Sequence, residues 1–136
     1  MHKFLVVIPA RFKSTRYPGK PLAKINGYPM IYLTWKQCLK ATDKKNIYVA
    51  TDDKRIANVC KKYDMNYQLT SSKCKTGTDR IYDFSKKIRA STYINIQGDE
   101  PFIKPKDIKK IIKLSTQKKY SSTVLNGMSK ILNYKD

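Results

Sequence analysis

A run of cationic and polar side chains directly follows the first apolar segment of the chain. Residues 4–9 are almost entirely apolar and predict a buried strand. The basic loop after this strand, residues 10–20, contains Arg11, Ser14, Arg16, Gly19 and Lys20. Open α/β sheets bind phosphates at the carboxyl ends of their strands, and arginine and lysine are rarely buried without a partner. The basic loop therefore predicts a phosphate site, with Arg11, Arg16 and Lys20 as contacts and Ser14 and main-chain N–H groups completing it.

The alternative for the same loop is a solvated surface segment, because the whole chain is rich in lysine. Its 136 residues carry a formal net charge of +19, from 29 basic and 10 acidic side chains, and only five of the basic ones are arginine. Nucleic-acid-binding domains more often gather arginine and aromatic side chains on one face. We therefore expect most of this charge to be solvated and expect no nucleic-acid partner. The glycine spacing fits neither a Walker A motif nor a dinucleotide-binding motif.

A second candidate group follows another β-prone segment, residues 92–96. The next five residues read QGDEP and place the carboxylate of Asp99 at the end of a predicted strand. Mg²⁺ is often held by one carboxylate together with phosphate and water oxygens, so Asp99 is the predicted metal ligand. The alternative is a β-turn, for which Gly, Asp and Pro are the usual residues. The basic loop predicted on the same sheet favours the magnesium interpretation.

A third polar segment reads TGTDR over residues 76–80. Two hydroxyl groups and a glycine can approach a base or a ribose closely, and an arginine can meet a phosphate or an internal carboxylate. The nucleotide-binding candidates here are Thr76, Gly77, Thr78 and Arg80. The alternative is a helix N-cap with Asp79 in the first turn, which we favour for Asp79 itself. Asp52 and Asp53 are likewise predicted to cap a helix.

Apolar segments alternate with amphipathic ones along the chain. Strands are predicted at residues 4–9, 46–50, 67–70, 92–96 and 121–125, and helices over 30–39, through Ile56, through Ile81 and Phe84, and from Pro105. A tight turn is predicted at Asn26-Gly27. This alternation predicts a three-layer α/β/α, Rossmann-like fold with a mainly parallel sheet and right-handed crossovers. We expect a single nucleotide-binding domain over residues 1–136 that ends before the architecture is closed, and is therefore truncated at the C-terminus.

The cysteines and the apolar segments predict the compartment. Three cysteines at wide spacing fit neither a disulfide framework nor a metal site, so free thiols are expected. The first apolar segment is too short for the core of a signal peptide, and no segment has the length of a membrane span. The sequence therefore predicts a cytoplasmic protein without a membrane partner. Its single histidine, His2, gives no support to a histidine-based catalytic triad.

Five blocks of sequence resemble one known family. In chain order they read VIPARFKSTRYPGKPL, INGYPMI, VATDD, TGTDRI and INIQGDEPFI. Together they resemble the N-terminal portion of the 3-deoxy-manno-octulosonate cytidylyltransferase family, also called CMP-KDO synthetase. The resemblance implies a nucleotidyltransferase fold and transfer of CMP from CTP to a 2-keto-3-deoxy sugar acid, with Mg²⁺, release of pyrophosphate and a role in lipopolysaccharide assembly. It also implies triphosphate binding by the basic loop, a place near the nucleotide for Gln97, and Asp99 as magnesium ligand.

Members of that family are considerably longer than this chain. The resemblance implies that their later portion supplies a second metal-binding aspartate, much of the sugar pocket and the dimer contacts. We therefore expect CTP and an acidic sugar as partners, with either a homodimer or a complementing C-terminal segment. Three alternatives stay open: a different acidic sugar, a truncated or split nucleotide-binding protein without independent catalysis, and a lysine-rich nucleic-acid binder.

Overall fold

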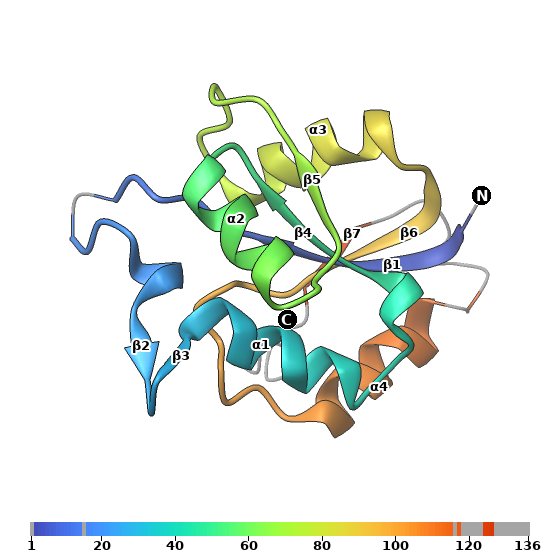
Figure 1. Cartoon of the computed structure of the whole chain (residues 1–136). Helices are drawn as coiled ribbons and strands as arrows, with labels where there is room; N and C mark the ends of the chain where they lie inside the picture. The colour runs from blue at the N-terminus through green and yellow to red at the C-terminus, as the bar shows by residue number, and fades with distance from the viewer. Residues whose placement is uncertain (1, 15, 116, 118–123, 127–136) are drawn as a thin grey trace.

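A five-stranded parallel sheet forms the centre of the computed structural model (Figure 1), which describes residues 2–14, 16–115, 117 and 124–126. Its order is β5-β4-β1-β6-β7, and every neighbouring pair is parallel. The strands are β1 (His2–Pro9), β4 (Ile47–Thr51), β5 (Tyr67–Leu69), β6 (Ala90–Asn95) and β7 (Val124–Asn126). The four earlier strands confirm the predicted ones to within two residues at each end. Of the strand predicted at 121–125, residues 121–123 lie outside the described part of the chain.

Four α-helices connect the strands: α1 (Met30–Leu39), α2 (Lys54–Lys62), α3 (Gly77–Lys87) and α4 (Pro105–Ser115). Each buries apolar side chains at helical spacing, as Ile31, Trp35 and Cys38 do in α1. The predicted start of α4 at Pro105 is confirmed. α3 begins at Gly77, so part of the segment expected to be a loop is helical. Two short 3₁₀ helices, η1 (Lys20–Leu22) and η2 (Lys44–Asn46), complete the helical elements described.

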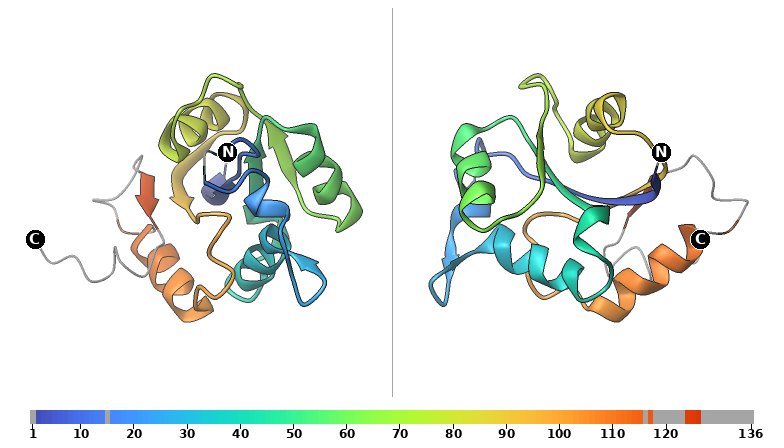
Figure 2. Two further views of the ribbon diagram at one scale, coloured as in Figure 1. Left: turned by 90° about the vertical axis from the view of Figure 1, so that its left-hand side faces the viewer. Right: turned by 45° about the vertical axis from the view of Figure 1, so that its right-hand side comes forward.

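Helices cover both faces of the sheet (Figure 2), and each face carries its own core, between which the side chains of the strands alternate. Val6 and Ile8 of β1 belong to the larger core, with apolar residues of α1, α2 and α4. Leu5 and Val7 belong to the smaller core, with Ile81 and Phe84 of α3. The molecule therefore has helices on both faces of a parallel sheet, which confirms the predicted three-layer α/β/α architecture.

One of the four crossovers has the opposite hand to the others. The chain moves from β1 to β4 and β5 with α1 and α2 on one face, and returns to β6 with α3 on the other face, so these three crossovers share a hand. It then continues outward to β7 with α4 on the α1 face, which reverses the hand. The expectation of right-handed crossovers throughout is therefore wrong. Ile103, Ile108 and Ile111 are buried in the α1-side core, and this packing holds α4 on that face.

A small antiparallel hairpin lies between the basic loop and α1. It consists of β2 (Lys24–Ile25) and β3 (Tyr28–Pro29). Asn26 and Gly27 have φ values of 52° and 84°, and two positive values in succession are typical of the tightest hairpin turns. The predicted turn is confirmed, although the sequence did not indicate the two short strands beside it.

Side chains cap α2 and α3 at their N-termini. Asp53 Oδ1 accepts a hydrogen bond from the Arg55 backbone N–H at 2.8 Å, so the predicted capping role of Asp53 is confirmed. Thr76 Oγ1 accepts from the Asp79 backbone N–H at 3.0 Å. The capping role predicted for Asp52 is wrong, because only Asp53 directly precedes the first helical residue and can reach the free N–H groups.

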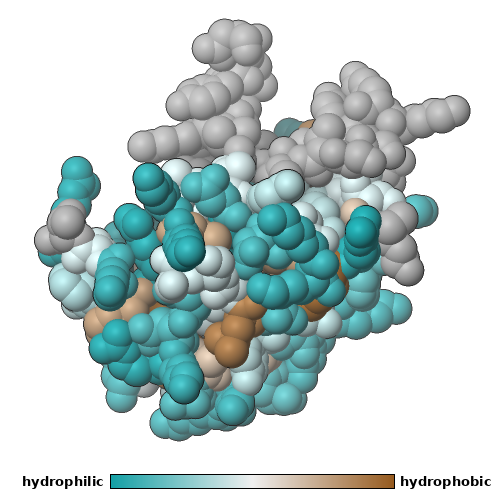
Figure 3. Space-filling model, turned by 90° about the horizontal axis from the view of Figure 1, so that it is seen from above, coloured by the Kyte–Doolittle hydropathy of each residue, from teal (hydrophilic) through white to brown (hydrophobic). Residues whose placement is uncertain are grey.

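Seen from above, the molecular surface is mostly hydrophilic, with small separate hydrophobic areas (Figure 3). The residues that the structure describes include no helix that combines the length and apolar character needed to cross a membrane.

The first prediction concerns Asp53. Its carboxylate also accepts two bonds from the Arg55 side chain, which together with the backbone bonds hold the pKa of Asp53 below its ordinary value. The stabilisation of the folded state by the ionised Asp53 carboxylate is therefore present at neutral pH and is lost as the pH falls through the lowered pKa. We expect Asp53→Ala to lower the free energy of unfolding by about 1 kcal/mol at neutral pH, and by less at acid pH.

Urea unfolding at neutral and acid pH measures both values. Asp53→Asn is the matched control, because asparagine keeps the cap but removes the charge. An equal loss for Asp53→Ala at both pH values would contradict the ionised carboxylate as its source.

Candidate functional site

The loops that follow β1 and β6 meet at the carboxyl edge of the sheet. β1 and β6 are parallel neighbours, and the chain continues from β1 toward β4 in one direction along the sheet and from β6 toward β7 in the other. Such a reversal of strand order opens a crevice between the two loops, which is where open α/β sheets bind ligands. Figure 1 shows the chain leaving both strands at the same end of the molecule.

A cavity of about 540 Å³ opens between these two loops. The predicted site residues that line it are Arg11, Ser14, Arg16, Lys20, Gln97 and Asp99. Lys20 Nζ lies 3.0 Å from Asp99 Oδ2, although 79 positions separate the two residues in the sequence. Phosphate-binding and metal-binding candidates from separate segments thus face one cavity. We call it the main cavity.

The ion pair between Lys20 and Asp99 is accessible to solvent. Each side chain keeps 44% of its surface exposed. Exposed pairs of this kind contribute at most about 1 kcal/mol of stability, because water screens both charges. Folding therefore does not require the pair, and both groups can exchange their partner for a ligand at small cost.

Gly19 shapes the basic loop and is not among the residues that line the main cavity. Its φ of +73° lies in the left-handed region, and a Cβ at this position would lie 2.8 Å from the Phe12 ring. Its N–H donates to the Phe12 carbonyl at 2.7 Å. Gly19 thereby turns the chain into η1, which begins at Lys20. The sequence predicted a nucleotide contact here, whereas the structure supplies a conformational reason for the glycine.

Residues of α2 hold the other side of the basic loop. The guanidinium carbon of Arg55 lies 3.3 Å from the centroid of the Phe12 ring, a cation–π contact. Asp53 accepts two bonds from the same guanidinium, at 3.0 and 2.7 Å, and so fixes its plane. The sequence analysis missed this contact, because only the parallel pairing of β1 and β4 brings Phe12 next to α2.

A second cavity of about 310 Å³ adjoins the main one and shares Arg11 and Gln97 with it. Thr76, Gly77 and Arg80 of the third predicted segment line it, whereas Thr78 lines neither this cavity nor the main one. A Cβ on Gly77 would lie 3.3 Å from Gln97 Nε2 and 3.3 Å from Pro9 Cγ. The glycine therefore lets the N-terminus of α3 approach the ends of β1 and β6.

Arg80 is held inside the protein. Its side chain is 4% exposed and donates to Thr70 Oγ1 at 2.7 Å and to the Ser71 carbonyl at 3.3 Å. Its Nη2 lies 3.5 Å from Asp52 Oδ1. Of the two partners predicted for Arg80, the structure shows the internal carboxylate, and it also explains why Asp52 does not cap α2.

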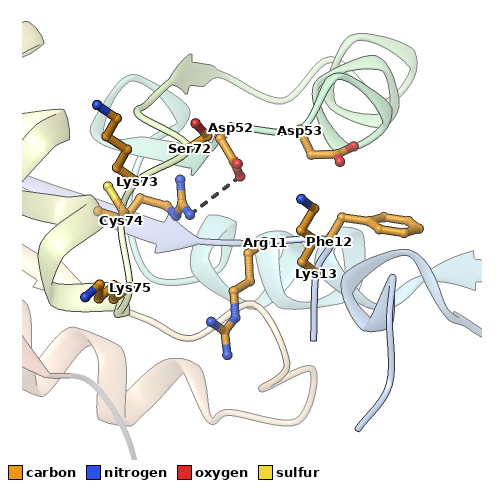
Figure 4. Close-up of a pocket in the computed structure, with 10 residues that line it drawn as sticks. Arg11, Phe12, Lys13, Asp52, Asp53, Ser72, Lys73, Cys74 and Lys75 are labelled. Carbon is orange, nitrogen blue, oxygen red and sulfur yellow. Dashed lines mark ion pairs between the residues drawn. The ribbon is translucent and has the colours of Figure 1, made fainter. Parts of the chain in front are cut away.

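The ion pair of Asp52 with Arg80 borders a third cavity, of about 510 Å³, shown in Figure 4. Arg11 and Lys13 line it from the basic loop, and Lys73 and Lys75 line it from the segment before α3. In Figure 4 the Arg11 side chain points away from Asp52 and Asp53. Arg11 also lines the other two cavities and is therefore the cation shared by all three.

Only a small number of acidic groups is available to a metal ion. Among the described residues, no three His, Cys, Asp or Glu side chains gather as a metal site. A single half-exposed carboxylate facing a cation-lined cavity nevertheless fits Mg²⁺, which prefers hard oxygen ligands and takes the remainder from phosphates and water. Asp99 is the residue that would hold it.

The three cysteines are free thiols. Cys38 and Cys60 are fully buried, and burial raises the pKa of each to about 12. Cys74 lines the two smaller cavities, and burial raises its pKa as well. None of these thiols is activated as a nucleophile.

Comparison with known proteins identifies the class of the fold. A solved structure described as CMP:2-keto-3-deoxy-manno-octonic acid synthetase complexed with CTP superimposes with a TM-score of 0.78 at 39% identity, over 82% of this chain and 46% of that one. The fold is therefore that of the α/β nucleotidyltransferases, as predicted. A family model described as cytidylyltransferase matches residues 5–133. The chain belongs to the cytidylyltransferase family.

Two of the curated relatives illustrate the activities named among similar proteins. A 3-deoxy-manno-octulosonate cytidylyltransferase of Parabacteroides distasonis is 47% identical over 113 residues, which cover 82% of this chain and 44% of the relative. An 8-amino-3,8-dideoxy-manno-octulosonate cytidylyltransferase of a Shewanella species is 43% identical over 112 residues, covering 80% and 46%. These matches confirm the predicted resemblance. The chain spans about half the length of the curated relatives it matches.

The second prediction separates two glycines with positive φ. Gly19→Ala and Gly27→Ala each place a side chain in the left-handed region, which costs about 1 kcal/mol. Only at Gly19 does the new methyl group also meet an aromatic ring, since a Cβ on Gly27 has nothing within 4 Å. We expect Gly19→Ala to be the more destabilising, and Gly27→Ala serves as its matched control.

Thermal and urea unfolding of both variants measure the difference. Equal losses would mean that the basic loop yields to the methyl group without strain.

Proposed function

We propose that this chain binds CTP with Mg²⁺ at the carboxyl edge of β1 and β6 and serves transfer of CMP to 3-deoxy-manno-octulosonate or a closely related sugar acid. The observation that carries the proposal is the meeting of Lys20 and Asp99, at 3.0 Å, in a cavity also lined by Arg11 and Arg16. A triphosphate and its metal ion need cations and one hard carboxylate side by side, and the main cavity offers both. The names of the relatives support the same chemistry.

Each group of residues has a distinct role in this proposal. Arg11, Arg16 and Lys20 contact the triphosphate, and Ser14 donates a hydrogen bond to it. Thr76 and Gly77 at the start of α3, together with Gln97 after β6, receive the base and ribose in the second cavity. Arg80 supports that cavity from within through Thr70, rather than by touching the ligand.

The reaction would be an in-line displacement at the α-phosphorus. A hydroxyl oxygen of the sugar forms the new bond to phosphorus, and the bond to the bridging oxygen of pyrophosphate breaks. Negative charge grows on the departing pyrophosphate, so preorganised cations stabilise the transition state more than the ground state. Mg²⁺, when bound at Asp99, would neutralise phosphate charge and orient the triphosphate.

The sugar has two candidates. The relative from Shewanella acts, by its name, on the 8-amino sugar and is nearly as similar as the relative named for 3-deoxy-manno-octulosonate. Both sugars share the 2-keto acid end, so the same nucleotide site serves either. We also propose a cytoplasmic location, which the free thiols support, and a place in lipopolysaccharide synthesis, which follows from the sugar.

The third prediction tests the proposed ligand. CTP with Mg²⁺ is expected to raise the melting temperature of the chain, whereas ATP, GTP and UTP have smaller effects, because a bound ligand stabilises only the folded state. Differential scanning fluorimetry with each nucleotide, with and without Mg²⁺, measures this. Single-stranded DNA at several salt concentrations is the control, since a nucleic-acid binder would prefer it with a steep salt dependence.

A turnover assay then separates the open alternatives. CTP with each of the two sugars is expected to release pyrophosphate with the preferred sugar only. Binding of CTP without release of pyrophosphate supports a nucleotide-binding protein that lacks independent catalysis. Mass measurement in solution tests the homodimer, and addition of a C-terminal segment of a relative tests complementation. Equal stabilisation by all four nucleotides would contradict the proposed cytidylyl specificity.

The fourth prediction concerns Lys20. Lys20→Met keeps much of the apolar stem but removes the charge, so we expect about a hundredfold loss of turnover or, where only binding is measured, a clear loss of CTP affinity. The melting temperature should change little, because the pair with Asp99 is half-exposed. Lys24→Met, at an exposed position in the hairpin, is the control and should match the wild type. Normal CTP binding by Lys20→Met would remove Lys20 from the site.

A further inference from the structure

Helix α1 supports both of the loops that form the main cavity. η1, which begins at Lys20, packs against α1. On the other side, the loop after β6 forms hydrogen bonds with two α1 side chains, at Gly98 and at Ile103. We call residues 98–103 the acidic loop, because it carries Asp99 and Glu100. Figure 1 shows this loop passing close to α1 on its way to α4.

The first bond joins Thr34 to the residue before Asp99. Thr34 is completely buried, and its Oγ1 donates to the Gly98 carbonyl at 3.1 Å. A mid-helix threonine usually turns its hydroxyl to the carbonyl four residues earlier, but the distance to Met30 O is the longer one, at 3.3 Å. A buried carbonyl is costly to leave unpaired. The hydroxyl therefore fixes the Gly98 peptide from the side of α1.

The end of β1 also contacts Gly98. A Cβ on Gly98 would lie 3.3 Å from the Pro9 carbonyl oxygen and 3.7 Å from Ala10 Cβ. Gly98 is therefore already in close contact with β1 and has little room to move toward it. Held between β1 and Thr34, it determines where the backbone of Asp99 begins.

The second bond closes the far end of the acidic loop. Gln37 Nε2 donates to the Ile103 carbonyl at 2.8 Å, and the Ile103 side chain is buried in the α1-side core. Gln37 lies one turn after Thr34, so the two side chains point along one side of the helix. Between the two anchors the loop is open to solvent, with Phe102 79% exposed.

We propose that Thr34 is a positioning residue: by binding the Gly98 carbonyl it holds the Asp99 carboxylate at the main cavity, and Gln37 secures the other end of the acidic loop. The inference rests on the proposed function, in which Asp99 holds Mg²⁺ with the nucleotide. Asp99 makes its one described side-chain contact with Lys20, a partner that the proposed function assigns to the triphosphate. The backbone anchor must then keep the carboxylate in place while its partner changes.

The fifth prediction compares Thr34→Val with Thr34→Ser. Valine keeps the shape of the side chain and removes the hydroxyl, whereas serine keeps the hydroxyl. In Thr34→Val we expect faster hydrogen exchange at the amides of residues 98–103, with exchange in β1 and β6 unchanged. We also expect the Mg²⁺-dependent part of CTP affinity to fall about tenfold, the low end of what loss of an outer-shell partner costs a metal site. CTP affinity without Mg²⁺ should stay as in the wild type.

Thr34→Ser should retain the wild-type amide exchange in the acidic loop and the wild-type Mg²⁺-dependent CTP affinity. This difference between the serine and valine variants separates positioning by the hydroxyl from a merely structural role of the side chain. Thr51→Val is the matched control: Thr51 is also fully buried, but its hydroxyl accepts from the Asp53 N–H, away from the acidic loop. Gln37→Met is a second variant at a half-buried position that releases the far anchor. It should speed amide hydrogen exchange near Ile103 and lower the Mg²⁺-dependent CTP affinity by less than Thr34→Val does.

Two results would overturn the inference. In one, Thr34→Val shows wild-type exchange in the acidic loop and a wild-type Mg²⁺ effect. In the other, serine and valine impair both properties equally, which would assign the effect to packing rather than to the hydroxyl. If the wild type itself binds no CTP with Mg²⁺, the proposed function fails, while the exchange measurement, which needs no ligand, still decides whether Thr34 fixes the acidic loop.

Discussion

The parallel pairing of β1 with β6 is the constraint on which the site depends. In this register Val6 lies opposite Ile94 and Val7 opposite Asn95, so both strands end at nearly the same level. The basic loop and the acidic loop therefore leave the sheet side by side, and Lys20 meets Asp99. A shift of one residue in this register would turn the buried side chains of β6 to the other face of the sheet, so the core itself keeps the two loops aligned.

The surrounding helices turn this alignment into a defined cavity. α2 holds the basic loop through the stacked Arg55 and Phe12, α3 approaches the strand ends at Gly77, and α1 binds the acidic loop. The reversed crossover also helps to form the cavity wall, because it brings the chain after β6 onto the α1 face. Each of the three helices thus fixes a different segment of the cavity wall.

The sequence predicted those features that depend on local pattern. Alternating apolar segments were enough for the sheet and helices, and residue type at strand ends was enough to single out Lys20 and Asp99. Contacts that depend on tertiary neighbours could not be predicted. No local sequence pattern indicated that Thr34 would bind Gly98 rather than its own helix, or that Arg55 would stack on Phe12. The sequence also contained no sign that α4 would pack on the α1 face and so reverse a crossover. The capping role predicted for Asp52 was wrong for the same reason, since the ion pair with Arg80 forms only in the folded chain.

The pairing of the first strand with a strand that begins at Ala90 has a consequence for the order of events during synthesis. Domains fold as the ribosome releases them, and contacts between distant segments must wait for the later segment and for closure of a long loop. β1 can pair with β4 early, but its other edge stays open until β6 emerges. During that interval an apolar strand edge is available to wrong partners. The two halves of the cavity thus come together only after β6 has left the ribosome.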